Sequence, residues 1–232
     1  MTILSVNVNK IATLRNSRGK NTPNLDFCTQ SIINYGAEGI TIHPRPDQRH
    51  INYNDVKTLS HITKKVEFNI EGFPSKKFLD IVLDIKPTQV TLVPDGPGVL
   101  TSLEGWDIIK NKVFLTDIVK QLNNTQIRTS IFIHPNIDTV QAALDIGADR
   151  IELFTGFYAD NNKLDSYIEC SQYAHTIGLG VNAGHDLSLK NLPLFIEKMP
   201  FLDEVSIGHA LISESLFFGL QKTIRSYKDI LK

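Results

Sequence analysis

The stretch DTVQAALDIGADRIELF, residues 138–154, contains a helix, a turn and a strand in immediate succession. Apolar residues recur at helical spacing from Val140 to Leu144. Gly147 then supplies a residue that tolerates the left-handed conformation in which many helices end. The short apolar run RIELF follows directly and is typical of a buried strand. A helix that leads straight into a strand in this way predicts parallel strands with right-handed crossovers.

The same unit recurs along the chain, at YGAEGI (residues 35–40) and more loosely at IGLGV (residues 177–181). Helical patterns cover Asp26–Tyr35, Ser75–Ile85 and Asp138–Ile146. Eight β-branched runs that read as apolar on both faces fit buried strands: ILSVNV (3–8), GITIHP (39–44), VEFNIE (66–71), QVTLVP (89–94), TSIFIHP (129–135), RIELFTG (150–156), LGVNAG (179–184) and EVSIGHA (204–210). No linker-like segment divides the chain. We therefore predict an α/β fold, one closed (β/α)8 TIM-barrel domain over residues 1–232.

The composition restricts the partners. With 25 acidic and 24 basic side chains the net charge is -1, so no basic field favours nucleic acid. Two cysteines, Cys28 and Cys170, are too few for a disulfide framework and fit a reducing cytoplasm. We expect both to be inert packing residues. No apolar run is long enough for a signal peptide or a membrane span, so we expect a cytoplasmic protein with no membrane partner.

Polar residues end most of the predicted strands, where a (β/α)8 barrel places its chemistry. From the first strand to the eighth these are Asn7, Asn9 and Lys10; His43, Arg45, Arg49 and His50; Glu71; Glu152 and Thr155; Asn182 and His185; and His209. A carboxyl group inside an apolar run, as in FNIEG and RIELF, is costly to desolvate unless it is paired or used. One such Glu alone fits a structural ion pair, but the convergence of several polar residues on one rim favours an active site.

The remaining histidines are weaker candidates. His61 and His175 lie in helical segments and are expected to be ordinary surface or packing residues. His134 ends a strand, but the proline after it indicates a turn. A His/Glu cluster at the rim could also bind a divalent metal. Because its ligands would come from separate strands with no spacing motif, we expect no metal site.

The seventh and eighth strands end in Gly-His dipeptides, at Gly184 and Gly208. Barrels often bind phosphate at these two strands through backbone N–H groups. Arg18, in an expected loop over residues 15–19, is a further phosphate candidate or simply a solvated arginine. The longest Gly- and Pro-containing loop, DGPGVLTSLEGW (residues 95–106), is either an active-site lid or an inert surface excursion.

Together these residues resemble a known family. The runs VNVNKIATLRNSRG, GITIHPRPDQRHI, FNIEG, ELFTGFYA, VNAGH and SIGHALI are similar to those of the pyridoxine 5′-phosphate synthase family and spread from residue 6 to residue 212. The resemblance implies a barrel with additional helices, assembled as a homo-octamer. It implies condensation of 3-amino-2-oxopropyl phosphate with 1-deoxy-D-xylulose 5-phosphate, two small phosphorylated substrates, to give pyridoxine 5′-phosphate. No cofactor is implied, and no dinucleotide or phosphate-loop motif is present.

The resemblance also implies residue roles, carried over position by position. His43 and Glu71 would accept protons, His185 would donate one, and Glu152 would stabilise charged intermediates. The aminoketone phosphate would be bound by Asn7, Arg18, Asp186, Gly208 and His209. The deoxyxylulose phosphate would be bound by Asn9, Lys10, Arg45, His50 and Thr101.

The chain departs from the common family pattern at three positions. Many members have Asp-His where this chain has Asn9-Lys10, and many have Gly where it has Asp186. Lys10 would attract the sugar phosphate as a point charge. A carboxylate beside a phosphate is repulsive, so we expect the side chain of Asp186 to point away and to cap a helix starting near Ser188.

Two other functions compete with the synthase. The first is another sugar-phosphate barrel enzyme, either an epimerase or a Schiff-base aldolase in which Lys10 would be the nucleophile. The second is a non-catalytic phosphate-binding barrel, because a fold alone never fixes a function.

Overall fold

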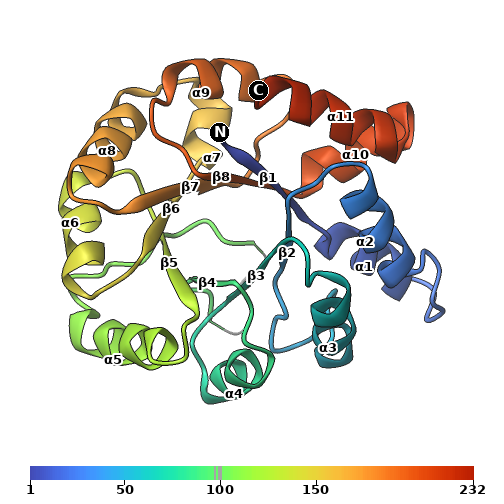
Figure 1. The fold of residues 1–232 in the computed structure, drawn as a ribbon, viewed down its shortest axis with the longest axis horizontal. Helices are drawn as coiled ribbons and strands as arrows, with labels where there is room; N and C mark the ends of the chain where they lie inside the picture. Colours follow the sequence, from blue (N-terminus) through green and yellow to red (C-terminus); the bar gives the residue numbers. More distant parts are fainter. Residues whose placement is uncertain (97, 99–100) are drawn as a thin grey trace.

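Eight parallel strands close into a barrel in the computed structural model, which describes residues 1–96, 98 and 101–232 (Figure 1). Each strand pairs with the next along the chain, and β1 pairs with β8. The strands are β1 (Ile3–Asn7), β2 (Gly39–Ile42), β3 (Glu67–Gly72), β4 (Gln89–Leu92), β5 (Arg128–Ile133), β6 (Arg150–Phe154), β7 (Gly180–Gly184) and β8 (Glu204–Ile207). The predicted (β/α)8 barrel is confirmed.

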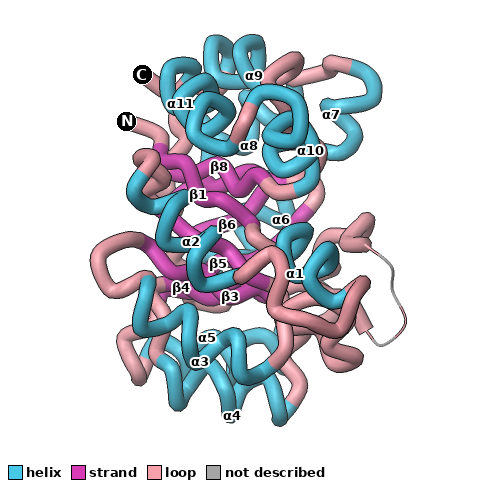
Figure 2. Tube along the Cα trace, turned by 90° about the vertical axis from the view of Figure 1, so that its right-hand side faces the viewer, coloured by secondary structure: helices cyan, strands magenta, loops and turns pink. Residues whose placement is uncertain are grey.

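Helices surround the barrel, and in the side view the strands lie in the middle of the molecule between them (Figure 2). They are α1 (Asn9–Asn16), α2 (Leu25–Asn34), α3 (Tyr53–Ile62), α4 (Lys76–Ile85), α5 (Lys112–Asn123), α6 (Ile137–Asp145), α7 (Gly156–Asn161), α8 (Asp165–Thr176), α9 (Leu192–Lys198), α10 (His209–Phe218) and α11 (Leu220–Ile230). The units after β1, β6 and β8 each carry two helices, which are the additional helices that we expected. Among the described residues, no helix combines the length and apolarity that crossing a bilayer requires.

Local signals in the sequence agree with the backbone. Ser75 caps α4 by accepting a hydrogen bond from the N–H of Phe78. Gly147 follows α6 with a φ of +83°, which is the left-handed helix end that residues 138–154 predict. Cys28 and Cys170 lie in α2 and α8 as free thiols, and burial raises the pKa of the Cys170 thiol to about 12. The expected loop after β1 starts later than predicted, because α1 extends to Asn16.

The inside of the barrel is polar, so our interpretation of the strands as apolar on both faces is wrong for the inner face. Thr41 shares a hydrogen bond of 2.7 Å with Ser5, and Thr91 donates to Asn69 over 3.1 Å. These polar residues come from different strands and are fully or almost fully buried. The apolar core lies instead between the outer face of the sheet and the helices. The polar interior allows carboxyl groups to continue from the rim into the barrel.

Candidate active site

His43 and Glu71 lie side by side where β2 and β3 end. Their Nδ1 and Oε2 atoms are 3.7 Å apart, and Asn7 donates from Nδ2 to the same carboxylate oxygen over 3.4 Å. Burial, with a smaller contribution from the charge of Arg45, holds the pKa of His43 well below 6.5. Burial, followed by the nearby Glu152 carboxyl group, raises the pKa of Glu71 well above its usual value. The pair therefore favours a neutral imidazole beside a protonated carboxyl group.

Asn9 connects the ends of the first two strands. The N–H of Asn9 donates to Oδ1 of Asn7 over 3.0 Å, and the N–H of His43 donates to Oδ1 of Asn9 over 3.0 Å. The Asn9 side chain thus fixes the backbone at His43. Lys10 follows in the first turn of α1 and is exposed.

Arg45 lies in a buried ion pair that sequence reasoning missed. Its guanidinium is 2.8 Å from Oδ2 of Asp95, and both side chains are buried. Ser102 donates a short hydrogen bond to the same carboxylate oxygen. Asp95 directly follows the run that contains β4, and this position was the signal that could have identified it. The pair joins the end of β2 to the segment after β4.

His50 is held in a single tautomer. Its Nδ1 accepts a hydrogen bond of 2.9 Å from the N–H of Ile51, which leaves the proton of the neutral ring on Nε2. Burial, then the charges of Arg45 and Lys10, lowers the pKa of His50 to about 4. The carbonyl of His50 accepts from Arg15, whose guanidinium pairs with Asp55 at 2.6 Å. His50 is therefore a neutral hydrogen-bond donor on a fixed backbone.

Glu152 is the carboxyl group inside the barrel mouth. It is 3% exposed, and Thr91 donates to its Oε2 over 3.3 Å. Burial and the Glu204 carboxyl group raise its pKa to about 8. A Cβ at Gly184 would lie 2.6 Å from Oε1 of Glu152, so glycine leaves room for the carboxyl group in its present position. Glu152 is thus packed against the end of β7 and is largely protonated near pH 7.

His185 and Asp186 follow β7. Nδ1 of His185 lies 2.7 Å from Oδ2 of Asp186, and its Nε2 lies 3.1 Å from Oγ1 of Thr101. The expected helix cap is wrong: α9 begins at Leu192 and not near Ser188, and its N-terminus has no side-chain cap. The reason is local, because a left-handed backbone at Asp186, with φ +57°, directs its carboxylate to the preceding imidazole.

Gly208 directly follows β8, and His209 begins α10. A Cβ at Gly208 would lie 3.0 Å from Cβ of Asn7, so the two strand ends are in close contact. The pKa of Asp186 is lowered by its hydrogen bond with His185 and further by the charges of His209 and Lys10. The structure therefore brings five of the predicted phosphate ligands to one side of the barrel mouth: Asn7, Lys10, Asp186, Gly208 and His209.

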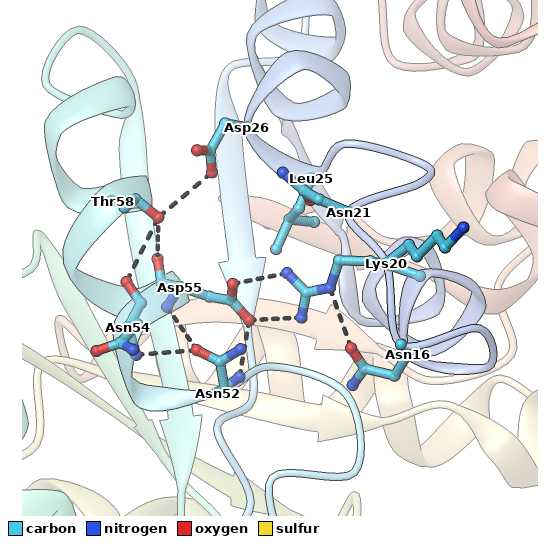
Figure 3. A pocket seen from close by; sticks show the side chains of 11 residues that line it. Asn16, Lys20, Asn21, Leu25, Asp26, Asn52, Asn54, Asp55 and Thr58 are labelled. Carbon is cyan, nitrogen blue, oxygen red and sulfur yellow. Dashed lines mark hydrogen bonds and ion pairs between the residues drawn. The ribbon is translucent and has the colours of Figure 1, made fainter.

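Arg18 is joined to the strand-end residues by no hydrogen bond or ion pair in the described part of the chain. It lies on the exposed turn after α1. The neighbouring Gly19 and Lys20 line a cavity of about 450 Å³ between this turn and α3. Figure 3 shows Lys20 on one side of this cavity and Thr58 of α3 on the other. The cavity lies outside the group of strand-end residues.

The expected lid, residues 95–106, is only partly placed, since residues 97, 99 and 100 lie outside the described residues. Its described end lies against β5, where the N–H of Trp106 donates to the carbonyl of Phe132 over 2.8 Å. His134 accepts from the N–H of Gly105 over 3.2 Å. Thr101 and Ser102 contact His185 and Asp95, so the described part of the segment spans the mouth. Among the residues that the structure describes, no group of three or more His, Cys, Asp or Glu side chains could hold a metal ion.

Comparison with known proteins identifies relatives along the full length. The chain is 52% identical over 238 residues to a pyridoxine 5′-phosphate synthase of Christiangramia forsetii and 50% identical to one of Bacteroides fragilis, with 100% of each chain covered. Among solved structures it resembles a thiamine phosphate pyrophosphorylase from Pyrococcus furiosus, with a TM-score of 0.62, 14% identity and 99% and 95% of the two chains covered.

Tryptophan synthase from M. tuberculosis, in an aminoacrylate-bound form, gives a TM-score of 0.66 at 9% identity, with 100% and 94% of the two chains covered. Likenesses of such low identity concern the barrel alone. A family model described as "Pyridoxal phosphate biosynthesis protein PdxJ" matches residues 4–232. With this match and two relatives at about half identity, the chain belongs to the PdxJ family of pyridoxal phosphate biosynthesis proteins.

Proposed function

We propose that this protein is a pyridoxine 5′-phosphate synthase. It joins 3-amino-2-oxopropyl phosphate to 1-deoxy-D-xylulose 5-phosphate, and releases one phosphate and two waters as the pyridine ring closes. One observation supports this proposal apart from family membership: groups suited to binding phosphate follow two different strands at the same mouth of the barrel. Arg45 and His50 follow β2, Gly208 and His209 follow β8, and the Glu71 and Glu152 carboxyl groups, whose pKa values are raised, project from β3 and β6.

The groups after β2 and β8 suit two phosphates. Arg45 offers a guanidinium already oriented by Asp95, and His50 offers a neutral Nε2–H. After β8, the first backbone N–H groups of α10 follow Gly208 and suit an anion. Lys10 is close enough to lower the pKa of both His50 and Asp186, so its charge acts on groups after both β2 and β7. These groups are the proposed substrate ligands, with Asn7, Asn9 and Thr101 beside them.

Proton transfer is the chemistry that the reaction needs between the two phosphates. Schiff-base formation, phosphate elimination and ring closure each require a group that takes or returns a proton. A neutral His43 can accept a proton, and Glu71, whose pKa is raised by burial, can hold a proton and release it. Below about pH 8 the carboxyl group of Glu152 holds a proton. A positively charged imine beside it would favour release of that proton. We assign proton donation to His185, on the opposite side of the mouth.

The aldolase alternative has less support. A Schiff-base lysine is activated by desolvation, whereas Lys10 is exposed. Borohydride reduction in the presence of deoxyxylulose phosphate separates the two mechanisms. The synthase predicts no covalent adduct at Lys10, and an adduct there would favour the aldolase. A non-catalytic barrel predicts that purified protein makes no pyridine chromophore from the two substrates, whereas the synthase predicts that it does.

We also propose an oligomer, with the octamer as its expected form, in the cytoplasm. An exposed apolar run at the end of α10 supports a subunit interface, since Leu216, Phe217 and Phe218 are 76%, 84% and 54% exposed. The two free thiols fit a reducing compartment. Light scattering on the purified protein would measure the number of subunits.

A further inference from the structure

His185 makes two hydrogen bonds through opposite ring nitrogens. Nδ1 meets Oδ2 of Asp186 at 2.7 Å, and Nε2 meets Oγ1 of Thr101 at 3.1 Å. A carboxylate can only accept a hydrogen bond, so Nδ1 of His185 must carry a hydrogen in this contact. The neutral ring then presents the lone pair of Nε2 toward Thr101, and the charged ring presents Nε2–H there.

The backbone holds these two residues in a conformation that side chains rarely adopt. His185 and Asp186 have φ angles of +89° and +57°. Non-glycine residues in this region are uncommon, and such strain persists where neighbouring groups enforce it. Thr155 donates from Oγ1 to the carbonyl of His185 over 2.5 Å, and Asn191 donates to the carbonyl of Asp186 over 3.0 Å. The contact between His185 and Asp186 is therefore built into the turn.

The surroundings of the pair favour an ionised carboxylate. The charges that act on Asp186 besides His185 are His209 and Lys10, both cationic or able to become so. Phe154 packs against the His185 ring, with centroids 4.9 Å apart, and restricts the rotation of the imidazole. The ring is thus held by the carboxylate at Nδ1 and by its contact with the Phe154 ring.

We propose that Asp186 is a positioning residue that orients His185 for proton donation. In that step the Nε2–H bond of the imidazolium breaks, the proton moves to the departing oxygen of the substrate, and Nδ1–H stays hydrogen-bonded to Asp186. The inference rests on the proposed synthase function for the role of His185. The tautomer and orientation of the ring do not depend on that function.

The test uses Asp186→Asn and Asp186→Gly, because both residues tolerate the left-handed backbone. Asp117→Asn, on the exposed face of α5, is the matched control. Solid-state NMR of 15N-histidine-labelled protein at about pH 9, where imidazoles are neutral, reports the tautomer. The His185 signals are assigned by their loss in His185→Asn. We expect the Nδ1–H tautomer in the wild type and in the control, and a mixture in the Gly variant.

Kinetics of the same variants give the second readout. Loss of a carboxylate that orients a metal-bound imidazole typically costs roughly 10–100-fold; by analogy we expect about tenfold in kcat for Asp186→Gly, at the low end of this range. The KM for aminoketone phosphate should stay within about twofold, because the change affects the chemical step. An unchanged tautomer in the Gly variant would overturn the proposal, as would a raised KM with an unchanged kcat. If the wild type makes no product, the synthase proposal fails while the tautomer measurement still decides the role of Asp186.

Discussion

His43 and Glu71 are neighbouring side chains whose protonation differs from that in water. Burial lowers the pKa of the imidazole and raises the pKa of the carboxyl group, so each favours its neutral form. With Nδ1 and Oε2 3.7 Å apart, the two can serve one substrate from adjacent positions. The pair is thus suited to exchange protons without leaving a buried charge unpaired.

His43→Asn and Glu71→Gln keep the bulk of each side chain but remove proton exchange. We expect each variant to fold normally and to lose turnover by ~10²–10⁴-fold. The measurement is kcat together with the circular dichroism spectrum. Near-normal turnover in both variants would rule out the catalytic assignment.

Lys10 is expected to act through charge alone. It is exposed, and its charge lowers the pKa of both His50 and Asp186. Lys10→Met should raise the KM for deoxyxylulose phosphate more than it lowers kcat, which is the signature of lost uniform binding. Lys20→Met, on the turn beside the outlying cavity, is the control. A loss confined to kcat would instead indicate a chemical role for Lys10.

At the scale of elements, the ends of strands were predictable and the contacts between loops were not. Glu71 and Glu152 stand out because an ionisable residue in an apolar run has few structural explanations. The position of Asp95 directly after the β4 run is a weaker signal, and Ser102 gave none, since polar residues are ordinary in loops and their partner Arg45 is 50 residues or more away. The polar interior of the barrel was missed because Ser and Thr fit a strand pattern as well as apolar residues do.

The Arg45–Asp95 ion pair joins the end of β2 to the segment after β4. Removing the charge of Asp95 should therefore weaken the attachment of that segment. Breaking a buried ion pair by removing one charge costs about 3–5 kcal/mol, and Asp95→Asn should approach the lower figure because the amide can still accept hydrogen bonds. Inorganic phosphate should raise the melting temperature of the variant more than that of the wild type, since an anion can replace the carboxylate. Equal shifts in calorimetry would contradict this account.

At the scale of the whole molecule, the closed topology was predictable because eight strand runs and three glycine-ended helices all indicated parallel pairing. Carboxyl groups inside the barrel lower the stability of the fold when they ionise, and their burial is evident only from the folded structure. Glu204 is 1% exposed at the start of β8, and burial raises its pKa from 4.5 to about 7 despite the nearby Arg150. Because the pKa is higher in the folded protein, the neutral carboxyl group contributes to stability. This contribution is fully present below about pH 4.5 and is lost as the pH rises through about 7.

Glu204→Gln removes this titration. The wild type should therefore lose unfolding free energy relative to the variant between about pH 4.5 and 7, by a total on the order of 3 kcal/mol. Above about pH 7 the difference between the two proteins should stay constant. Chemical denaturation at several pH values measures the difference in unfolding free energy between the wild type and the variant. If this difference does not change with pH, the role given to Glu204 is refuted.

The central claim is that one mouth condenses two phosphorylated substrates and closes a pyridine ring. The most direct measurement is the ratio of released phosphate to pyridine product when purified protein is mixed with both substrates, each omitted in turn. We predict one phosphate for every pyridoxine 5′-phosphate formed and no product when either substrate is missing. Phosphate release without a pyridine product, or no reaction with both substrates present, would contradict the account.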